Sequence, residues 1–301
     1  MKIHIYTDIA NLFGQACRVW MDVVLAAGHE AEIIDIGTGN GEPLPEVGPS
    51  DVNLLVAGIY ATARFKKWGL PGPGKNVLWM FDPLTQQQDA VAHNYKSADF
   101  DAIAPQLDAV IAMDASIAAY VHRHHPRLPV TQVPYLVASK NIMTPLAEPN
   151  RTGGVLFMGG QTARRTAVDD HFKAHPLQAE FVWAGLWGAA RDDKRRRSRI
   201  SLNIHADARH TYFDQYRTLE AWAAGTAVVT ETTGGLVDWG IVPETHLVMA
   251  DLPYLPEVCT ELLADTTRRE RITQAAQELL RAQFSPQRWR KEMLSVLENI
   301  P

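Results

Sequence analysis

The chain has 301 residues, of which 46% are hydrophobic and 21% charged, and its formal net charge is −5. This length and composition are typical of two globular domains and exclude a disordered or fibrous protein. The negative charge argues against a surface built throughout to hold nucleic acid or anionic lipid, so any anion site must be local.

Short apolar segments alternate with helical patterns through the first half of the chain. These segments are apolar on both faces, which is typical of parallel strands covered by helices on each side. A helix is predicted over residues 14–28, where apolar side chains recur at helical spacing until Gly28. We predict strands at residues 2–6, 31–36, 52–57, 76–81, 109–113 and 130–133.

The periodicity is lost in residues 139–152, which contain two prolines, and we interpret this segment as an interdomain linker. The pattern then restarts and predicts a second α/β domain. The expected division is a first domain over residues 1–138, a second over 153–285, and a C-terminal helix over 286–301 that crosses back to the first. The strands of the second domain are predicted at residues 154–158, 180–183, 200–205, 227–230 and 247–249.

Cysteine content and hydropathy bear on the cellular compartment. Cys17 and Cys259 are the two cysteines, which cannot form a disulfide framework or a cysteine-based zinc site. The first residues lack the pattern of a signal peptide, and no segment approaches the roughly 18 apolar residues of a membrane span. We expect a cytoplasmic protein, at most peripheral to a membrane, that binds no metal or resident cofactor and could form a homo-oligomer.

The segment 212–235 carries the strongest functional signal. It predicts a helix with small residues on one face, a stop at Gly225, a buried strand and a turn rich in threonine and glycine. This order places Glu220 and the turn near the carboxyl ends of parallel strands, where α/β proteins bind ligands. Glu220 lies in a largely apolar helix and needs a partner, which is either a ligand hydroxyl or, in the structural alternative, Arg217 or a backbone amide.

A second candidate site follows the first strand of the second domain. Gly159 and Gly160 leave the strand and allow the backbone to approach a ligand closely. The next helix then begins near Arg164 and Arg165, so amide donors and positive charge are available for a phosphate. The alternative is an ordinary strand-to-helix turn with solvated arginines.

The segment 216–231, which reads YRTLEAWAAGTAVVTE, resembles the donor-site signature of GT-B glycosyltransferases of the glycosyl transferases group 1 superfamily, especially the CgeB-like branch. Residues 76–83, NVLWMFDP, are similar to a segment in the N-terminal domains of that branch. The resemblance implies two Rossmann-like α/β/α domains that face each other across a cleft. It also implies transfer of a sugar from a nucleoside diphosphate sugar, first of all a UDP-sugar, to an unidentified acceptor without a metal.

The resemblance also implies roles for individual residues. Glu220 would bind the donor ribose, and either Arg164 or Arg165 would bind the diphosphate. The remaining donor-site candidates are Gly159, Gly160, His205, Arg217, Thr233, Gly234 and Gly235. This sequence departs from the family at Tyr212, which stands where many members have a first glutamate, eight positions before Glu220.

Candidates for acceptor-side chemistry come from the first domain. Asp8 ends the first predicted strand, and Asp82 and His93 lie on or after the fourth. Each could act as a general base or bind a sugar hydroxyl. The structural alternatives are loop caps for the two aspartates and a surface position for the histidine.

Residues 191–199 contain six basic side chains, which predict either a solvated helix face or a surface for an anionic acceptor. The replaced family glutamate keeps a second class of function open, a noncatalytic nucleotide-sugar-binding or surface-assembly protein. Two further alternatives are a nucleotide-sugar 2-epimerase and an enzyme that glycosylates a DNA base. Nucleic acid is otherwise not expected as a partner.

Overall fold

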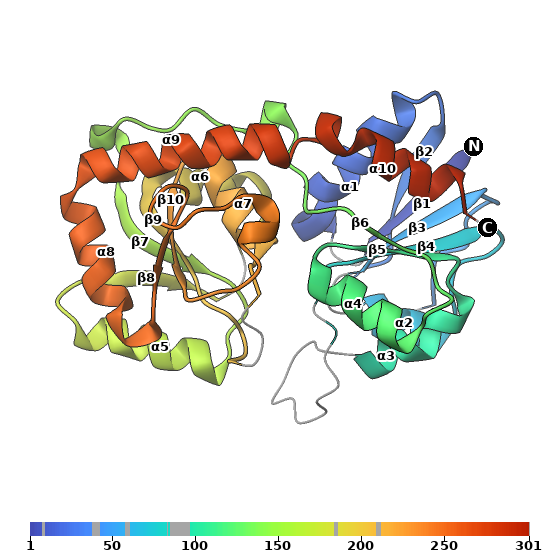
Figure 1. The fold of residues 1–301 in the computed structure, drawn as a ribbon, viewed down its shortest axis with the longest axis horizontal. Coiled ribbons are helices and arrows are strands. Elements are labelled where there is room, and N and C mark those ends of the chain that lie inside the picture. The colour runs from blue at the N-terminus through green and yellow to red at the C-terminus, as the bar shows by residue number, and fades with distance from the viewer. Residues whose placement is uncertain are drawn as a thin grey trace. The chain divides into compact units, whose positions relative to one another are not determined.

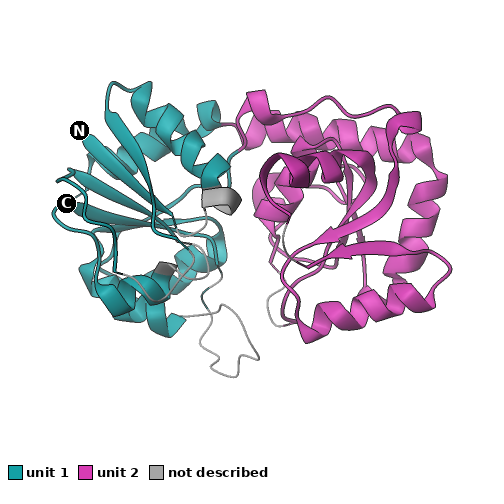
Figure 2. Cartoon of the chain, turned by 180° about the vertical axis from the view of Figure 1, so that it is seen from behind, with its two compact units in different colours: residues 1–136, 286–301 teal, residues 137–285 magenta. Residues whose placement is uncertain are grey.

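The computed structural model describes residues 1–7, 10–37, 43–57, 61–82, 84, 97–183, 186–208 and 212–300. The chain divides into two compact units, unit 1 with residues 1–136 and 286–301 and unit 2 with residues 137–285 (Figure 2). Each unit is built on one parallel sheet, so the predicted fold class of two Rossmann-like α/β domains is confirmed.

The sheet of unit 1 has the order β2-β1-β3-β4-β5-β6. Its inner strands are fully buried, as their continuous apolar sequence requires: Leu54, Val77 and Val110 are each 0% exposed. The strands are β1 (Lys2–Thr7), β2 (Glu30–Asp35), β3 (Val52–Ala57), β4 (Lys75–Met80), β5 (Ala109–Ala112) and β6 (Val130–Gln132).

Helices cover both faces of this sheet (Figure 1). One face carries α1 (Ala10–Leu25) and α10 (Pro286–Glu298), and the other carries α2 (Ala61–Trp68), α3 (Ser97–Ile103) and α4 (Ala115–His124). The C-terminal helix α10 packs on α1, where His29 Nε2 lies 2.9 Å from Glu298 Oε1. The 3-10 turn η1 (Ala104–Gln106) follows α3.

The sheet of unit 2 has the order β11-β10-β9-β7-β8. Its strands are β7 (Gly153–Met158), β8 (Ala179–Val182), β9 (Ser198–Asn203), β10 (Ala227–Glu231) and β11 (Val248–Ala250). Each strand predicted from the sequence, in both units, has a counterpart whose ends differ by at most two residues. The helix predicted over residues 14–28 corresponds to α1, which begins four residues earlier.

Helices again cover both faces (Figure 1). On one face lie α5 (Ala163–Ala174) and α8 (Leu255–Ala264), and on the other α6 (Gly188–Arg197), α7 (Gln215–Ala223) and α9 (Thr266–Gln283). Phe157, Phe172 and Leu202 belong to the hydrophobic core formed by the sheet and the helices that cover it. The short 3-10 turns are η2 (Ser139–Asn141), η3 (Glu148–Asn150), η4 (Val237–Trp239) and η5 (Leu252–Tyr254).

The segment interpreted as a linker, residues 139–152, belongs to unit 2. The Met143 amide donates to Ala223 O at 2.7 Å, and the Arg151 guanidinium donates to Ser198 O and Gly225 O, each at 2.7 Å. Gly225 has φ +73°, and a Cβ there would lie 2.8 Å from Pro145 Cα. The stop after α7 therefore requires glycine both for its backbone angle and for this close approach.

Candidate functional site

Unit 2 has a topological switch point between β7 and β9. β8 lies on one side of β7, whereas β9, β10 and β11 follow in order on its other side. Such a reversal leaves a crevice at the carboxyl ends of the strands, where ligands of α/β proteins bind. We call the residues at these ends the strand edge; the candidates on it are Gly159, Gly160, Asn203, His205 and Glu231.

Arg165 bridges the ends of the two strands at the switch point. Its Nε donates to Ile204 O at 2.9 Å after β9, and its Nη1 donates to Gly160 O at 2.8 Å after β7. The residue is 3% exposed. Helix α5 begins beside it, with the Thr162 hydroxyl accepting from the Arg165 amide at 3.2 Å. Arg165 thus fixes the shape of the crevice through main-chain carbonyls.

Arg164, the neighbouring residue, pairs with Glu231 at the end of β10. Arg164 Nη1 donates to Glu231 Oε1 at 2.9 Å, and Nη2 makes a second, shorter bond to Oε2. Two parallel bonds fix the orientation of the guanidinium. The Arg164 side chain is 21% exposed and that of Glu231 5%, so the arginine is the member of the pair that solvent reaches more.

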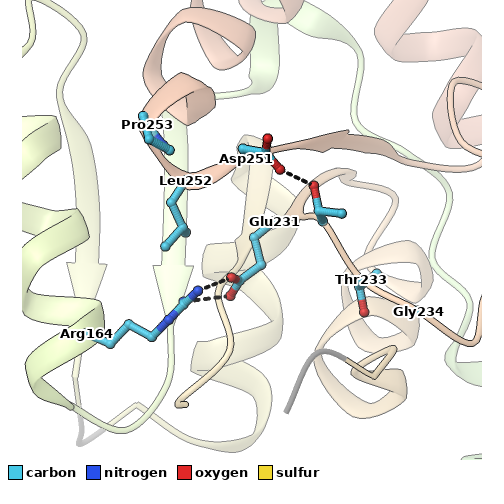
Figure 3. Close-up of a pocket in the computed structure, with 8 residues that line it drawn as sticks. Arg164, Glu231, Thr233, Gly234, Asp251, Leu252 and Pro253 are labelled. Carbon is cyan, nitrogen blue, oxygen red and sulfur yellow. Dashed lines mark hydrogen bonds and ion pairs between the residues drawn. The ribbon is translucent and has the colours of Figure 1, made fainter. Parts of the chain in front are cut away.

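The pair lies in a pocket of about 640 Å³ at this edge (Figure 3). Arg164 and Glu231 point toward each other, and Asp251 lies near Thr232, whose hydroxyl donates to Asp251 Oδ1 at 2.6 Å. Leu252 and Pro253 add an apolar side. The lining residues are Arg164, Glu231, Thr232, Thr233, Gly234, Asp251, Leu252 and Pro253.

His205 completes the surroundings of Glu231. The His205 amide donates to Glu231 Oε1, and its Nδ1 lies 3.0 Å from the same oxygen. Burial by itself would raise the pKa of Glu231, but the hydrogen bonds from His205 and Arg164 lower it below its ordinary value. Glu231 is therefore ionised at neutral pH and acts as an acceptor.

Arg217 lies at the β7 side of the strand edge. Its Nε donates to Asn203 Oδ1 at 3.2 Å and its Nη2 to Asp214 Oδ2 at 2.5 Å. A Cβ on Gly159 would lie 3.4 Å from Arg217 Nη1, so this guanidinium lies against the glycine backbone. Burial would raise the pKa of Asp214, but the charge and the amide of Arg217 lower it. The structure thus brings Arg217 together with Gly159.

Glu220, in contrast, is enclosed between α7 and α6. Its Oε2 lies 3.1 Å from Arg191 Nη2 and 3.2 Å from Arg195 Nη1, and all three side chains are at most 5% exposed. Arg191 Nη1 also donates to the Tyr216 hydroxyl at 2.5 Å. The partner expected from the sequence was a ligand hydroxyl, Arg217 or a backbone amide, whereas the structure supplies two arginines of α6. Glu220 does not line the pocket described above.

These contacts also change the interpretation of the basic segment 191–199. Arg191 and Arg195 are 4% and 3% exposed, so the expectation of a solvated helix face is wrong for both. Both face α7, where their guanidinium groups pair with the buried Glu220 carboxylate. Arg199 pairs with Glu148, and Arg197 Nε lies 2.8 Å from Asp193 Oδ2. Carboxylates therefore match much of this positive charge.

The turn after β10 packs against Tyr212. Gly235 has φ +74°, and a Cβ there would lie 2.8 Å from Tyr212 Cδ1, so the ring covers the turn. The Phe213 amide donates to Gly234 O at 3.0 Å, and Thr233 Oγ1 lies 3.5 Å from His205 Nε2. Tyr212 thus supports the predicted Thr233 to Gly235 turn.

The predicted acceptor-side residues belong to unit 1. Asp82 follows β4 and is partly exposed. Asp8 and His93 lie outside the described residues. Their roles stay predictions.

Sequence reasoning missed four residues at this site of unit 2, namely Asn203, Asp214, Glu231 and Asp251. A signal for Glu231 was present: a carboxylate ends the strand at residues 227–231, whose other residues are all buried. Asp214 has a local signal as the N-cap of α7, where it accepts from the Arg217 amide, and Asp251 directly follows β11.

Neither a metal centre nor a membrane helix is found in the part of the chain that the structure describes. Among these residues, no three histidine, cysteine, aspartate or glutamate side chains are grouped as metal ligands would be. Within the same residues, every helix is too short or too polar to cross a bilayer.

Comparison with known proteins gives a consistent result for the fold. Residues 192–295 match a family model described as glycosyl transferase-like. The structure is similar over 99% of the chain to sucrose-phosphate synthase from Thermosynechococcus elongatus, with 13% identity, 98% of that chain covered and a TM-score of 0.68. This chain has the GT-B fold.

Two further solved structures with the same fold contain nucleotides. HepE of Anabaena in complex with UDP and glucose has 11% identity and a TM-score of 0.66, with 99% of this chain and 100% of that chain covered. An alpha-glucosyltransferase in complex with UDP has 11% identity and a TM-score of 0.65, again with 99% of this chain and 100% of that chain covered. No curated protein sequence matches the chain. The family match is thus confined to residues 192–295, and the structural similarities show the fold.

Proposed function

We propose that this protein is a glycosyltransferase that moves a sugar from a nucleoside diphosphate sugar, first of all a UDP-sugar, to an acceptor such as a glycoconjugate, polysaccharide or protein. The observation that carries the proposal is the switch point of unit 2, where Gly159 adjoins Arg217 at the carboxyl ends of β7 and β9. The segment 216–231 further supports membership of the CgeB-like branch.

The chemistry that this site would perform is electrostatic. When the bond from the sugar to the diphosphate breaks, negative charge develops on the leaving phosphate, and fixed donors stabilise it. Arg165 and Arg217 lie on the β7 side of the crevice, with Asp214 as the neighbouring carboxylate. The glycine amides and the start of α5 add further donors.

The proposal includes transfer without a metal ion, because arginines and main-chain amides supply positive potential at the leaving group. The test is turnover of UDP-glucose with and without EDTA. Unchanged turnover supports metal independence, whereas loss of turnover that Mg²⁺ or Mn²⁺ restores contradicts it.

Thermal unfolding in the presence of UDP, GDP, ADP and UDP-glucose tests the donor site itself. A ligand that binds only the folded protein raises the melting temperature, by an amount that grows with the ratio of its concentration to Kd. We expect stabilisation by UDP and UDP-glucose that Arg217→Gln reduces and Arg271→Ala, on the exposed side of α9, does not. No stabilisation by any nucleotide at millimolar concentration would contradict the proposal.

A noncatalytic nucleotide-sugar-binding protein is a second candidate, favoured by one observation. Tyr212 stands at the position of the first family glutamate and covers Gly235 with its ring. Release of UDP from UDP-glucose, with the glucosyl group passing to water or to an added sugar acceptor, separates the two candidates, because a protein that only binds the donor leaves it intact.

A further inference from the structure

Three arginines lie at the strand edge of unit 2, and they differ in what their nitrogens contact. Arg164 donates from both terminal nitrogens to the Glu231 carboxylate. Arg165 donates from Nε and Nη1 to main-chain carbonyls. Arg217 donates from Nε and Nη2, whereas its Nη1 makes no hydrogen bond or ion pair with any residue that the structure describes. Arg217 therefore keeps one terminal nitrogen available for a ligand.

The open nitrogen of Arg217 faces a residue without a side chain. A Cβ on Gly159 would lie 3.4 Å from Arg217 Nη1, and 2.9 Å from Phe157 Cζ, where a neighbouring atom would have to move. Glycine is therefore required at residue 159, and it keeps the surroundings of Nη1 clear. The Arg217 side chain is 20% exposed, so an anion dissolved in water can reach this nitrogen.

Asn203 holds the guanidinium of Arg217 from the end of β9. Its Oδ1 accepts from Arg217 Nε at 3.2 Å, and the residue is 1% exposed. An arginine side chain has only donors, so the oxygen of the Asn203 amide, and not its nitrogen, must face it. Asp214 Oδ2 accepts from Arg217 Nη2 at 2.5 Å. Because Nε and Nη2 are both held, the planar guanidinium has one orientation, and Nη1 is directed toward Gly159.

Thr230 fixes the direction of the Asn203 amide. Asn203 Nδ2 donates to Thr230 Oγ1 at 3.1 Å, and the Thr230 hydroxyl donates in turn to Glu231 O at 3.1 Å. The hydroxyl proton is thus used, which leaves the hydroxyl oxygen to accept from the amide. Thr230 is 0% exposed, so its bonds are shielded from water. A buried chain of hydrogen bonds therefore runs from β10 through β9 to Arg217.

We propose that Asn203 is a positioning residue for sugar transfer. Its amide, oriented by Thr230, aims Nη1 of Arg217 at the space beside the glycine, where the diphosphate of the donor would lie. Asparagine suits this position because it accepts from Arg217 and donates to Thr230 at once, which neither aspartate nor leucine can do. A donor that is oriented in advance stabilises charge on the leaving phosphate without reorganisation. The proposal rests on the proposed function.

The test measures how strongly the protein prefers UDP to uridine, which lacks both phosphates. UDP is titrated calorimetrically, uridine is measured by its displacement of UDP, and the ratio of the two Kd values is the readout, because a general loosening of the fold affects both ligands. Asn203→Ala removes the amide without changing the charge. Thr230→Val removes the hydroxyl with little change in volume, and Thr230→Ser retains the hydroxyl. Asn53→Ala is the control, since Asn53 is also 1% exposed but belongs to the sheet of unit 1.

We expect Asn203→Ala to reduce the preference for UDP by about tenfold and Thr230→Val by about threefold, whereas Thr230→Ser and the control leave it unchanged. In protein that carries Arg217→Gln, Asn203→Ala should have no further effect, because its effect passes through Arg217. An unchanged preference in Asn203→Ala or Thr230→Val, or an equal loss in the Arg217→Gln background, would overturn the inference alone. Failure of the wild type to bind UDP would instead contradict the proposed function.

Discussion

Glu220 and Glu231 lie eleven positions apart in one helix–strand unit, yet they occupy opposite environments. Glu220 lies between α6 and α7, where Arg191 and Arg195 each approach its Oε2 to about 3 Å. Glu231 ends β10, where it orients Arg164 at a pocket. Both carboxylates are buried and both are bonded to arginine, but only the second faces space that a ligand could enter.

The difference follows from the elements that carry the two residues. A side chain in the middle of a helix that covers a sheet faces its neighbours, so its partner must be protein. A side chain at the carboxyl end of a parallel strand faces the loops that form ligand sites. For this protein, stability should therefore depend most on Glu220, and ligand binding on the strand edge.

The largest effect is expected from Glu220→Gln, which removes the buried carboxylate that Arg191 and Arg195 share and leaves them only the more exposed Asp192. Removal of one member of a buried ion pair costs about 3 kcal/mol or more. The free energy of unfolding should fall by that amount in urea titrations. Glu180→Gln provides the matched control, since Glu180 pairs with Lys194 at the surface, at 2.6 Å, and is 57% exposed; its cost should stay below about 1 kcal/mol. Equal costs for the two variants would contradict the structural role of Glu220.

The next effect concerns the turn that follows Glu231. Gly235→Ala places a Cβ 2.8 Å from Tyr212 Cδ1 at a residue with φ +74°, so the ring must move. We expect a loss of about 2 kcal/mol in unfolding free energy. The control is Gly154→Ala, because no atom lies within 4 Å of a Cβ added there. If both glycines tolerate alanine equally well, Tyr212 does not pack on the turn as described.

A smaller effect, and one that depends on pH, is expected from Glu231→Gln. The hydrogen bonds from His205 and Arg164 lower the pKa of Glu231 below its ordinary 4.5, so its stabilisation is present above pH 4.5 and lost as the pH falls through the lowered value. The variant should be about 1 to 2 kcal/mol less stable at pH 7, and the difference should shrink in acid. Unfolding measured between pH 7 and pH 3 checks this. A difference that does not change with pH would show that Glu231 contributes by packing rather than by charge.

The smallest effect is expected from Tyr216→Phe, on the Glu220 side of the comparison. Burial and the charge of Glu220 raise the pKa of Tyr216 to about 12, so the phenol is neutral and accepts from Arg191. Loss of this bond should cost about 1 kcal/mol and leave the affinity for UDP unchanged. A weaker affinity for UDP in this variant would place the donor nearer to α7 than we propose.

The fold could be predicted from the sequence because the patterns that indicate strands and helices are local. The strands at residues 52–57 and 76–81 are apolar on both faces, which only a sheet covered on both sides satisfies. The small-residue helix, Gly225 and the strand that follows predicted the order of elements around the site. Residues 139–152 were harder to interpret, since loss of periodicity cannot distinguish a free linker from a segment held by main-chain bonds such as that from Arg151 to Gly225.

The candidate site was only partly predictable. Gly159, Arg164 and Gly234 could be predicted because the turn after a buried parallel strand, and the start of the helix that follows it, lie where α/β proteins bind ligands. The pairing of Glu220 with Arg191 and Arg195 could not be predicted, because it depends on α6 packing against α7, which sequence spacing does not encode. The same is true of Asp251, which lines one pocket with Glu231 only because β10 and β11 are neighbours in the sheet.

Hydrogen–deuterium exchange with and without saturating UDP tests the donor site at the strand edge most directly, since it locates the nucleotide without a mutation. We predict slower exchange of amides in residues 158–166 and 231–236, at the ends of β7 and β10, and no change in α6. Protection confined to α6 and α7, or its absence throughout unit 2 at a UDP concentration that raises the melting temperature, would contradict a donor site at the strand edge.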